Sequence, residues 1–107
     1  MTMVQEVDTR KVNKHRANVV YAVKKYHSNN DTKVSEIATC FGKTENEITN
    51  WFCEAIEKEY IASDDICGSI IKKHIEEYEN KHKLTNSYLR LMYEEAVRKR
   101  KIELHNM

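Results

Sequence analysis

Apolar side chains recur every three or four residues along most of the chain, which is the period of an α-helix that buries one face. No segment alternates between apolar and polar positions as a half-buried strand does, and the sequence has no proline and only 2 glycines. The pattern therefore predicts an all-α fold. The predicted helices cover about residues 9–27, 33–41, 44–60, 63–81 and 85–101.

The most informative pair of these helices lies between Lys33 and Tyr60. The first helix of the pair ends before Gly42, because glycine most easily adopts the positive φ with which a chain leaves a helix. The second begins at Thr44, whose hydroxyl can form a capping box with Glu47. So short a connection predicts that the two helices cross steeply. Their apolar stripes are Val34, Ile37, Ala38 and Phe41 in the first helix, and Ile48, Trp51, Phe52, Ala55 and Ile56 in the second.

This pair resembles the helix-turn-helix of DNA-binding proteins in the spacing of Ala38, Gly42, Ile48 and Trp51. The run from Ile48 to Phe52 also resembles the third helix of homeodomain-like domains, which carries a similar aliphatic-x-x-Trp-Phe string. The resemblance covers roughly the first 60 residues. It implies a homeodomain-like tri-helical helix-turn-helix domain over residues 1–60, followed by a two-helix hairpin over residues 61–107.

The resemblance also implies which residues meet DNA. In helix-turn-helix proteins the exposed early residues of the second helix contact base edges, and here these are Thr44, Asn46, Thr49 and Asn50, of which Asn50 is the best single candidate. Phosphate contacts are expected from Lys11, Lys14, Lys33 and Lys43, with a further contribution from Arg98, Lys99, Arg100 and Lys101. An alternative for the last four is that they complement the dipole and the free carbonyls at a helix C-terminus.

The sequence departs from homeodomains at Glu54, where those proteins have an asparagine that reads adenine, followed by a basic cluster. Between Thr44 and Tyr60 this chain instead carries five glutamates and a single lysine. Such a helix is repelled by DNA, which carries one negative charge per about 1.7 Å of helix axis. Two functions therefore remain open for the same fold.

The first function is that of a small DNA-binding protein, acting as a transcriptional regulator or as a DNA-packaging or recognition factor. The second is that of a protein-interaction module that keeps the helix-turn-helix scaffold without binding DNA. In the second case a basic partner would bind the acidic face of Glu47, Glu54, Glu57 and Glu59. The formal net charge of +1 favours the second function, because DNA-binding domains usually carry a clear positive excess.

Apolar side chains cover more than half of the circumference of the predicted fifth helix. One neighbour cannot cover so wide a face, so part of it either closes on the first domain or pairs with a second chain. We favour a homodimer, in which the hairpin over residues 61–107 supplies the contact. The apolar residues of this helix are Tyr88, Leu89, Leu91, Met92, Tyr93, Ala96 and Val97.

The sequence lacks the familiar motifs of catalysis, metal binding and membrane insertion. Its 3 cysteines form no CxxC pair and its 5 histidines no HxxxH or HExxH pattern, so we expect reduced, buried thiols, no metal site and no cofactor. Without a Gly-rich phosphate loop or a G-x-S-x-G motif, we expect no enzyme. The first residues lack the apolar core of a signal peptide, and no run approaches the ~18 apolar residues of a membrane span, so we expect an intracellular protein.

Overall fold

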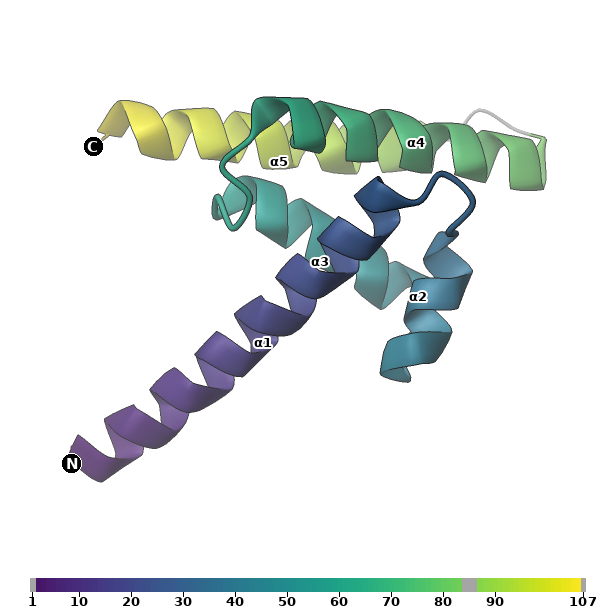
Figure 1. The fold of residues 1–107 in the computed structure, drawn as a ribbon. Helices are drawn as coiled ribbons and strands as arrows, with labels where there is room; N and C mark the ends of the chain where they lie inside the picture. Colours follow the sequence, from purple (N-terminus) through teal and green to yellow (C-terminus); the bar gives the residue numbers. More distant parts are fainter. Residues whose placement is uncertain (1, 84–86, 107) are drawn as a thin grey trace.

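Five α-helices form in the described part of the chain, which comprises residues 2–83 and 87–106, with side chains described for residues 13–83 and 88–102. In this computed structural model the all-α prediction is confirmed for that part. Figure 1 shows α4 and α5 side by side along one edge of the molecule, with α1 running away from them obliquely. The helices are α1 (Thr2–Ser28), α2 (Val34–Phe41), α3 (Glu45–Glu57), α4 (Asp64–His82) and α5 (Ser87–Asn106).

The first helix is longer than the hydrophobic pattern predicts. α1 spans 27 residues and begins at Thr2, whereas the pattern places its start near Thr9. Residues 2–9 contain no proline or glycine, and extending an existing helix is far easier than starting one, so the helix continues toward the N-terminus. In the described part of the chain, no helix is both long and apolar enough to cross a membrane.

The turn between α2 and α3 adopts the conformation that its glycine predicts. Gly42 has φ 65° and ψ 35°, in the left-handed region that favours glycine. Its amide donates to the carbonyl of Thr39 at 3.2 Å, and the amide of Lys43 donates to the carbonyl of Ala38 at 2.8 Å. These two bonds form a Schellman motif, which ends α2 and turns the chain directly into α3.

The predicted capping box of α3 is confirmed by its hydrogen bonds, and α4 also begins with an N-cap. The hydroxyl of Thr44 accepts from the amide of Glu47 at 3.1 Å, while the amide of Thr44 donates to the carboxylate of Glu47 at 3.1 Å. This is the complete capping box at the start of α3. At the start of α4, the hydroxyl of Ser63 accepts from the amide of Ile66 at 3.3 Å.

Residues from all five helices meet in one apolar core. α3 packs most extensively against α5, and it also contacts α2 and α1. The hairpin of α4 and α5 therefore closes on α1–α3, which is one of the two arrangements that the wide apolar face of the fifth helix allows. Trp51, predicted as a core residue, is half-buried at the edge of this core. The largest fully buried side chains include Tyr26, Ile37, Ile48, Phe52, Ile56, Ile70 and Tyr93.

Glu77 of α4 ties α1 and α2 to the hairpin. Its carboxylate accepts hydrogen bonds from the Val34 amide at 3.0 Å and from the Tyr26 hydroxyl at 2.6 Å. Lys33, which precedes α2, has no side-chain acceptor, so a carboxylate from a distant helix caps the first turn of α2 instead. The ammonium of Lys73, one turn earlier on α4, donates to the carbonyl of Tyr26 at 2.7 Å. The end of α1 and the start of α2 are thus both held against α4.

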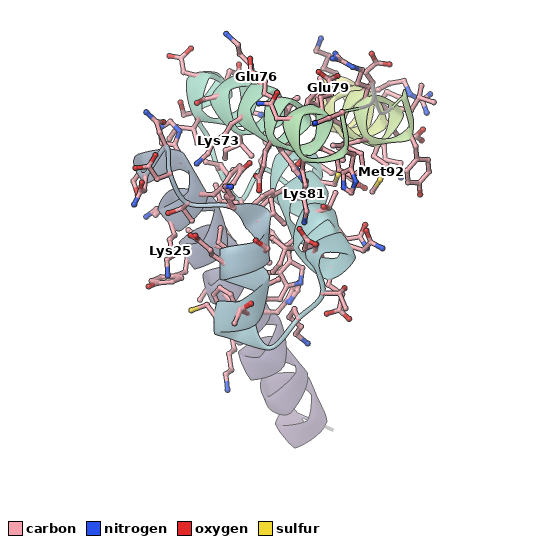
Figure 2. All side chains as sticks on the ribbon, turned by 90° about the vertical axis from the view of Figure 1, so that its right-hand side faces the viewer. Lys25, Lys73, Glu76, Glu79, Lys81 and Met92 are labelled. Carbon is pink, nitrogen blue, oxygen red and sulfur yellow. The ribbon has the colours of Figure 1, made fainter. Side chains whose placement is uncertain are left out.

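The variant Glu77→Ala is expected to lower the free energy of unfolding by about 2 kcal/mol, because the buried Tyr26 hydroxyl loses its acceptor and the first turn of α2 loses its cap. Urea unfolding followed by circular dichroism measures this loss. Glu76→Ala is the matched control, since Glu76 is exposed on the outer side of α4 (Figure 2), and a change below about 0.5 kcal/mol is expected for it. Equal losses in the two variants would contradict the role assigned to Glu77.

Candidate nucleic-acid interface

One strip of α3 contains no buried residue. It consists of Asn46, Asn50, Glu54 and Glu57, which follow one another at helical spacings of three or four residues and which we call the α3 strip. Asn46 and Asn50 are exposed, whereas Glu54 and Glu57 are half-buried. The N-terminal half of the strip is therefore formed by two uncharged amides, and its acidic half lies nearer the C-terminus of α3.

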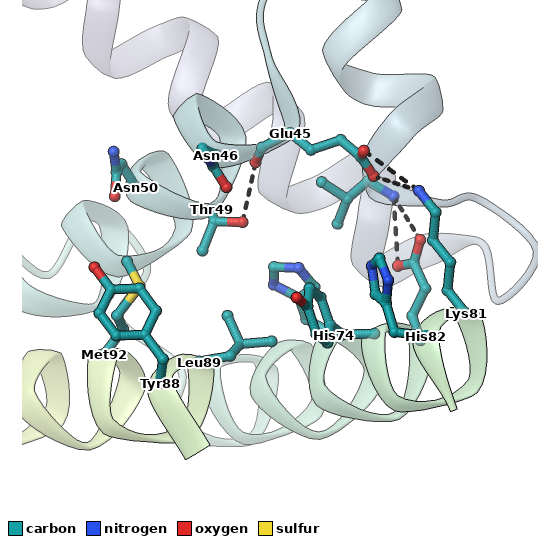
Figure 3. A pocket seen from close by; sticks show the side chains of 13 residues that line it. Glu45, Asn46, Thr49, Asn50, His74, Lys81, His82, Tyr88, Leu89 and Met92 are labelled. Atoms are coloured by element: carbon teal, nitrogen blue, oxygen red, sulfur yellow. Dashed lines mark hydrogen bonds and ion pairs between the residues drawn. The ribbon is translucent and has the colours of Figure 1, made fainter. Parts of the chain in front are cut away.

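The strip is flanked by α5. A cavity of about 480 Å³ lies between α3 and the hairpin, and its walls include Asn46 and Asn50 from α3 and Tyr88 and Met92 from α5 (Figure 3). Tyr88 is 71% exposed. These two α5 residues were predicted only as part of a wide apolar face. Their position beside the strip has no local signal in the sequence, because it arises from the packing of α5 on α3.

α5 runs beside α3 in the same direction. Tyr88, at the start of α5, shares the cavity with Asn50, whereas Arg100, near its end, pairs with Glu59 just beyond the C-terminus of α3. Lys99 follows Met92 by seven residues, or about two helical turns, so both project from the same side of α5. Lys99 is exposed there, on the side of α5 that flanks the strip.

Arg100 points inward, unlike its neighbours in the basic run. Its side chain is buried and its guanidinium contacts Glu59 at 3.3 Å and Asp64 at 3.0 Å. Arg98 and Lys101 are exposed, but they leave α5 on the sides away from its buried stripe. The basic run thus wraps around the helix instead of forming one patch. We leave Arg100 out of the candidate interface, since its guanidinium is already held by two carboxylates.

Thr49 is buried, in contrast to the expectation that it contacts a base. It is 7% exposed, and its hydroxyl donates to the carbonyl of Glu45 at 3.0 Å. At helical spacing it lies on the side of α3 that faces the hairpin, where it lines the cavity. We therefore leave Thr49 out of the candidate interface. Thr44 is exposed, although its hydroxyl serves the capping box.

Most of the acidic residues near α3 are paired with other groups. The carboxylate of Glu47 belongs to the capping box, where it also complements the positive end of the helix dipole. Three others contact basic side chains. Such half-exposed pairs add little stability, but they offset negative charge that would otherwise repel a phosphate backbone. The pairs are Glu45 with Lys81 at 3.1 Å, Glu54 with His15 at 2.6 Å and with Lys58 at 3.5 Å, and Glu59 with Arg100 at 3.3 Å.

Lys43 and Lys14 are exposed cations on segments that adjoin α3, whereas Lys58 is already paired with Glu54 of the strip. Lys43 occupies the turn directly before the N-cap of α3. Lys14 precedes His15, whose ring packs edge-on against Trp51 with 5.6 Å between centroids. Lys14 therefore leaves α1 at the level of α3. The contact of His15 with Trp51 and Glu54 is a feature that the hydrophobic pattern does not reveal.

The remaining predicted phosphate contacts lie elsewhere. Lys33 is exposed at the opposite end of α2 from Lys43, and an eight-residue helix is about 12 Å long. Lys11 belongs to α1, but its side chain lies outside the described residues. The structure thus places Lys43 directly before α3 and Lys14 next to His15, which contacts α3; it adds Lys99 from α5 and places Lys33 at the far end of α2.

Two titratable groups beneath the strip are kept neutral by burial. Burial, assisted by the carboxylate of Glu57, raises the pKa of Cys53 to about 11, so this thiol stays protonated and unreactive. Burial lowers the pKa of His74 to about 4, and its Nδ1 lies 2.5 Å from the Tyr93 hydroxyl. Cys40, by contrast, is exposed, which differs from the expectation of a buried thiol. It follows Thr39 on the outer side of α2.

The candidate interface therefore comprises the α3 strip, the turn residue Lys43, and two flanking cations, Lys14 and Lys99. It is built from three helices that are distant in sequence, and Asn46 and Asn50 form the uncharged N-terminal half of the strip. Comparisons of the chain with protein-family models, with curated proteins and with solved structures found no match.

Proposed function

We propose that this protein binds double-stranded DNA and that α1–α3 act as a homeodomain-like helix-turn-helix unit. The observation that carries the proposal is the exposure of Asn46 and Asn50 in the N-terminal half of α3, directly after the turn at Gly42. In helix-turn-helix proteins this part of the second helix reaches the base edges. A transcriptional regulator and a DNA-packaging factor would both use such a unit.

The chemistry of the strip suits the major groove. An asparagine amide has one acceptor oxygen and two donor hydrogens, and it can form two hydrogen bonds with the edge of adenine. Asn46 and Asn50 are four residues apart, so both amides face the groove together. Lys43 and Lys14 supply phosphate contacts on one side of these amides, and Lys99 supplies one on the other. Three such contacts correspond to a salt dependence with a slope of about −3 on a log–log plot.

Pairing of the glutamates with basic side chains of the same chain supports DNA binding, because paired carboxylates repel the phosphate backbone less than free ones. An unpaired acidic helix would be repelled by phosphates, but here Lys81, Lys58 and Arg100 contact Glu45, Glu54 and Glu59, respectively. Because the net charge is only +1, binding to random DNA is expected to be weak, and affinity on this proposal comes mainly from base contacts. Tyr88 and Met92 of α5 lie beside the strip, where they would face one wall of the groove.

Asn50→Ala is expected to weaken binding to a preferred duplex by about 1–3 kcal/mol, or five- to 150-fold, and to leave binding to a mixed-sequence duplex nearly unchanged. The preferred duplex is obtained first, by selection from a random pool with the wild-type protein. Lys14→Ala combined with Lys43→Ala should instead weaken both duplexes and reduce the salt slope by about 2. Fluorescence anisotropy over a salt series measures all of these quantities.

The controls for these variants are Asn80→Ala and Lys72→Ala, which remove an exposed amide and an exposed cation from α4. Neither should change binding to either duplex. Failure of the wild-type protein to retard any duplex at about 50 mM salt, where phosphate contacts are screened least, would overturn the proposal. Equal weakening by Asn50→Ala and Asn80→Ala would overturn the assignment of the strip.

A protein-interaction module is the second candidate function. One observation favours it: Glu57 and Glu54 form the C-terminal half of the strip, where a basic peptide could lie across them. Binding of such a basic peptide should be lost in the double variant Glu54→Gln and Glu57→Gln, and it should be unchanged in Asn50→Ala. DNA binding predicts the reverse order of effects, so the same set of variants separates the two functions.

A further inference from the structure

The outward face of α5 carries a second pattern, separate from the stripe that packs in the core. Leu89, Tyr93 and Ala96 are buried, whereas Leu91 and Ile102 are 60% and 48% exposed. Between these two exposed apolar residues, Glu95 and Arg98 lie on the same line at spacings of four, three and four residues. This alternation of four- and three-residue steps is the spacing of a coiled-coil seam, in which each side chain packs between residues of the facing helix. We call Leu91, Glu95, Arg98 and Ile102 the outer seam.

The order of residues along the outer seam is self-complementary. Reading from either end gives an apolar residue, a charged residue, a charged residue of opposite sign and an apolar residue. Glu95 and Arg98 already contact each other within one chain, at 2.9 Å, and both side chains remain more than half exposed. Large exposed apolar residues on a helix that otherwise has a polar outer side are typical of a contact surface.

We propose that two copies of this chain associate through the outer seam, with their α5 helices antiparallel around a two-fold axis between residues 96 and 97. Leu91 of each copy then meets Ile102 of the second copy, and Glu95 meets Arg98 of the second copy. Every contact occurs twice, as a two-fold interface requires. A parallel pair would instead place Glu95 against Glu95 and Arg98 against Arg98, so the central charges select the antiparallel orientation.

A neighbouring groove extends the same surface. Ile71 and Ile75 of α4 and Val97 and Ile102 of α5 line a mostly apolar groove on the outer side of the hairpin. Ile102 belongs to both the groove and the outer seam, so Leu91 of the second copy would lie at one end of the groove. The contact then involves both helices of each hairpin, as in a four-helix arrangement. The outer seam is about 16 Å long, so the interface is small and the dimer should be concentration-dependent.

This association goes beyond DNA binding and does not depend on it. The outer seam and the α3 strip share no residue, so either can fail experimentally without the other. Sedimentation of the purified 107-residue chain without DNA, over a concentration series, should show monomer and dimer in exchange. A monomer mass at every concentration would overturn the proposal.

The variant with Leu91→Glu and Ile102→Glu is expected to raise the dimer dissociation constant at least about 100-fold, since it removes the four apolar side chains of the two outer seams. Both positions are exposed, so circular dichroism should show an unchanged fold. Tyr21→Glu on α1 is the matched control, because Tyr21 is 56% exposed and lies away from the outer seam. Dissociation by Tyr21→Glu together with an intact dimer in the double variant would overturn the proposal.

Charge reversal tests the central contacts. Glu95→Arg alone and Arg98→Glu alone should each weaken the dimer, because each places like charges in facing positions twice. The variant that carries both reversals should recover dimerisation, since its charges again face opposite charges in the antiparallel pair. Continued weakness of the combined variant, with its fold intact, would overturn the antiparallel pairing.

Disulfide cross-linking tests the orientation directly. In a Cys40→Ser background, which removes the exposed native thiol, one preparation carries Leu91→Cys and another carries Ile102→Cys. Oxidation of the mixture should give the mixed cross-linked dimer. Each preparation alone should stay uncross-linked, because its two thiols lie about 16 Å apart and a disulfide needs Cα atoms within about 7 Å. Cross-linking of each preparation alone, without the mixed species, would overturn the antiparallel orientation.

Discussion

Replacing Phe52 with alanine is expected to lower the free energy of unfolding by about 3–5 kcal/mol, because truncating a buried phenylalanine removes apolar contacts and leaves a cavity. Phe52 is 0% exposed in α3. Its ring lies 5.1 Å from the ring of Tyr26 in α1 and 5.9 Å from the ring of His74 in α4, measured between centroids. One side chain thus contacts both α1 and the hairpin of α4 and α5, and all five helices should lose stability together.

Two optical signals separate this expectation from the alternative of two independent domains. Fluorescence of Trp51, the 1 tryptophan of the chain, reports on α3, whereas circular dichroism reports on every helix. In urea both signals should change at the same midpoint, in the wild-type protein and in the variant, because one core joins the helices. A helical transition that persists after the Trp51 signal is lost would contradict this expectation.

Phe41→Ala is the control for Phe52→Ala. Phe41 is the same residue type, but it is only partly buried, at the end of α2, where it packs against Trp51 with 5.1 Å between ring centroids. Its truncation leaves a site that water can enter, so the loss should be clearly smaller. A loss as large as that of Phe52→Ala would show that the rim, and not the centre of the core, carries the stability of this region.

Lowering the pH from 7 to 4 is expected to remove about 3 kcal/mol of stability through His74 alone. Burial lowers the pKa of His74 in the folded protein to about 4, against about 6.5 in the unfolded chain. The carboxylate of Glu45 acts in the opposite direction, but more weakly. Between these two pKa values the unfolded state binds the proton and the folded state does not. This contribution is therefore fully present above pH 6.5 and is lost as the pH falls toward 4.

The geometry around His74 explains why protonation opposes folding. The imidazole is 4% exposed, and the rings of Tyr26, Phe52 and Tyr93 surround it at centroid distances of 6.2, 5.9 and 5.7 Å. Burial also keeps the pKa of Tyr93 well above its ordinary value, so its hydroxyl retains the hydrogen that a neutral Nδ1 can accept. Adding a proton to Nδ1 would remove this acceptor and would place a charge among aromatic rings.

Urea unfolding at several pH values measures this effect. His74→Gln cannot titrate, so the fall in stability between pH 6.5 and 4 should shrink by about 3 kcal/mol relative to the wild-type protein. His27→Gln is the matched control, because His27 is exposed at the end of α1 and its removal should leave the slope unchanged. An unchanged pH dependence in His74→Gln would contradict the assignment.

The parts of the fold that were predictable from sequence are those governed by neighbouring residues. Gly42 ends α2 and Thr44 and Ser63 start the next helices, as predicted, because capping joins groups at most a few residues apart. The start of α1 was missed for a related reason. A missing cap or breaker does not stop a helix that is already formed, so the apolar period understates its length.

The arrangement of the candidate interface depends on contacts between distant segments, which a single sequence does not display. The exposure of Asn50 followed from the phase of the apolar stripe, but the burial of Thr49 required α5 to lie beside α3. Arg100 shows the same limit. It belongs to a basic run in which the four cations look equivalent, yet helical rotation directs it toward Glu59 and Asp64. Pairing of the α3 glutamates likewise depends on side chains from α1, α4 and α5.

The close packing of α5 on α3 bears on how a dimer would recognise an operator. The helix that carries the outer seam packs directly on the helix that carries Asn46 and Asn50, so a dimer would hold its two proposed DNA-contacting surfaces at a fixed separation. Such a dimer would bind two half-sites only when they have one particular separation and one relative rotation around the duplex. Inserting half a helical turn of DNA between the half-sites would place the second half-site on the opposite side of the duplex. The dimer could not then bind both half-sites while its α5 helices stay in contact.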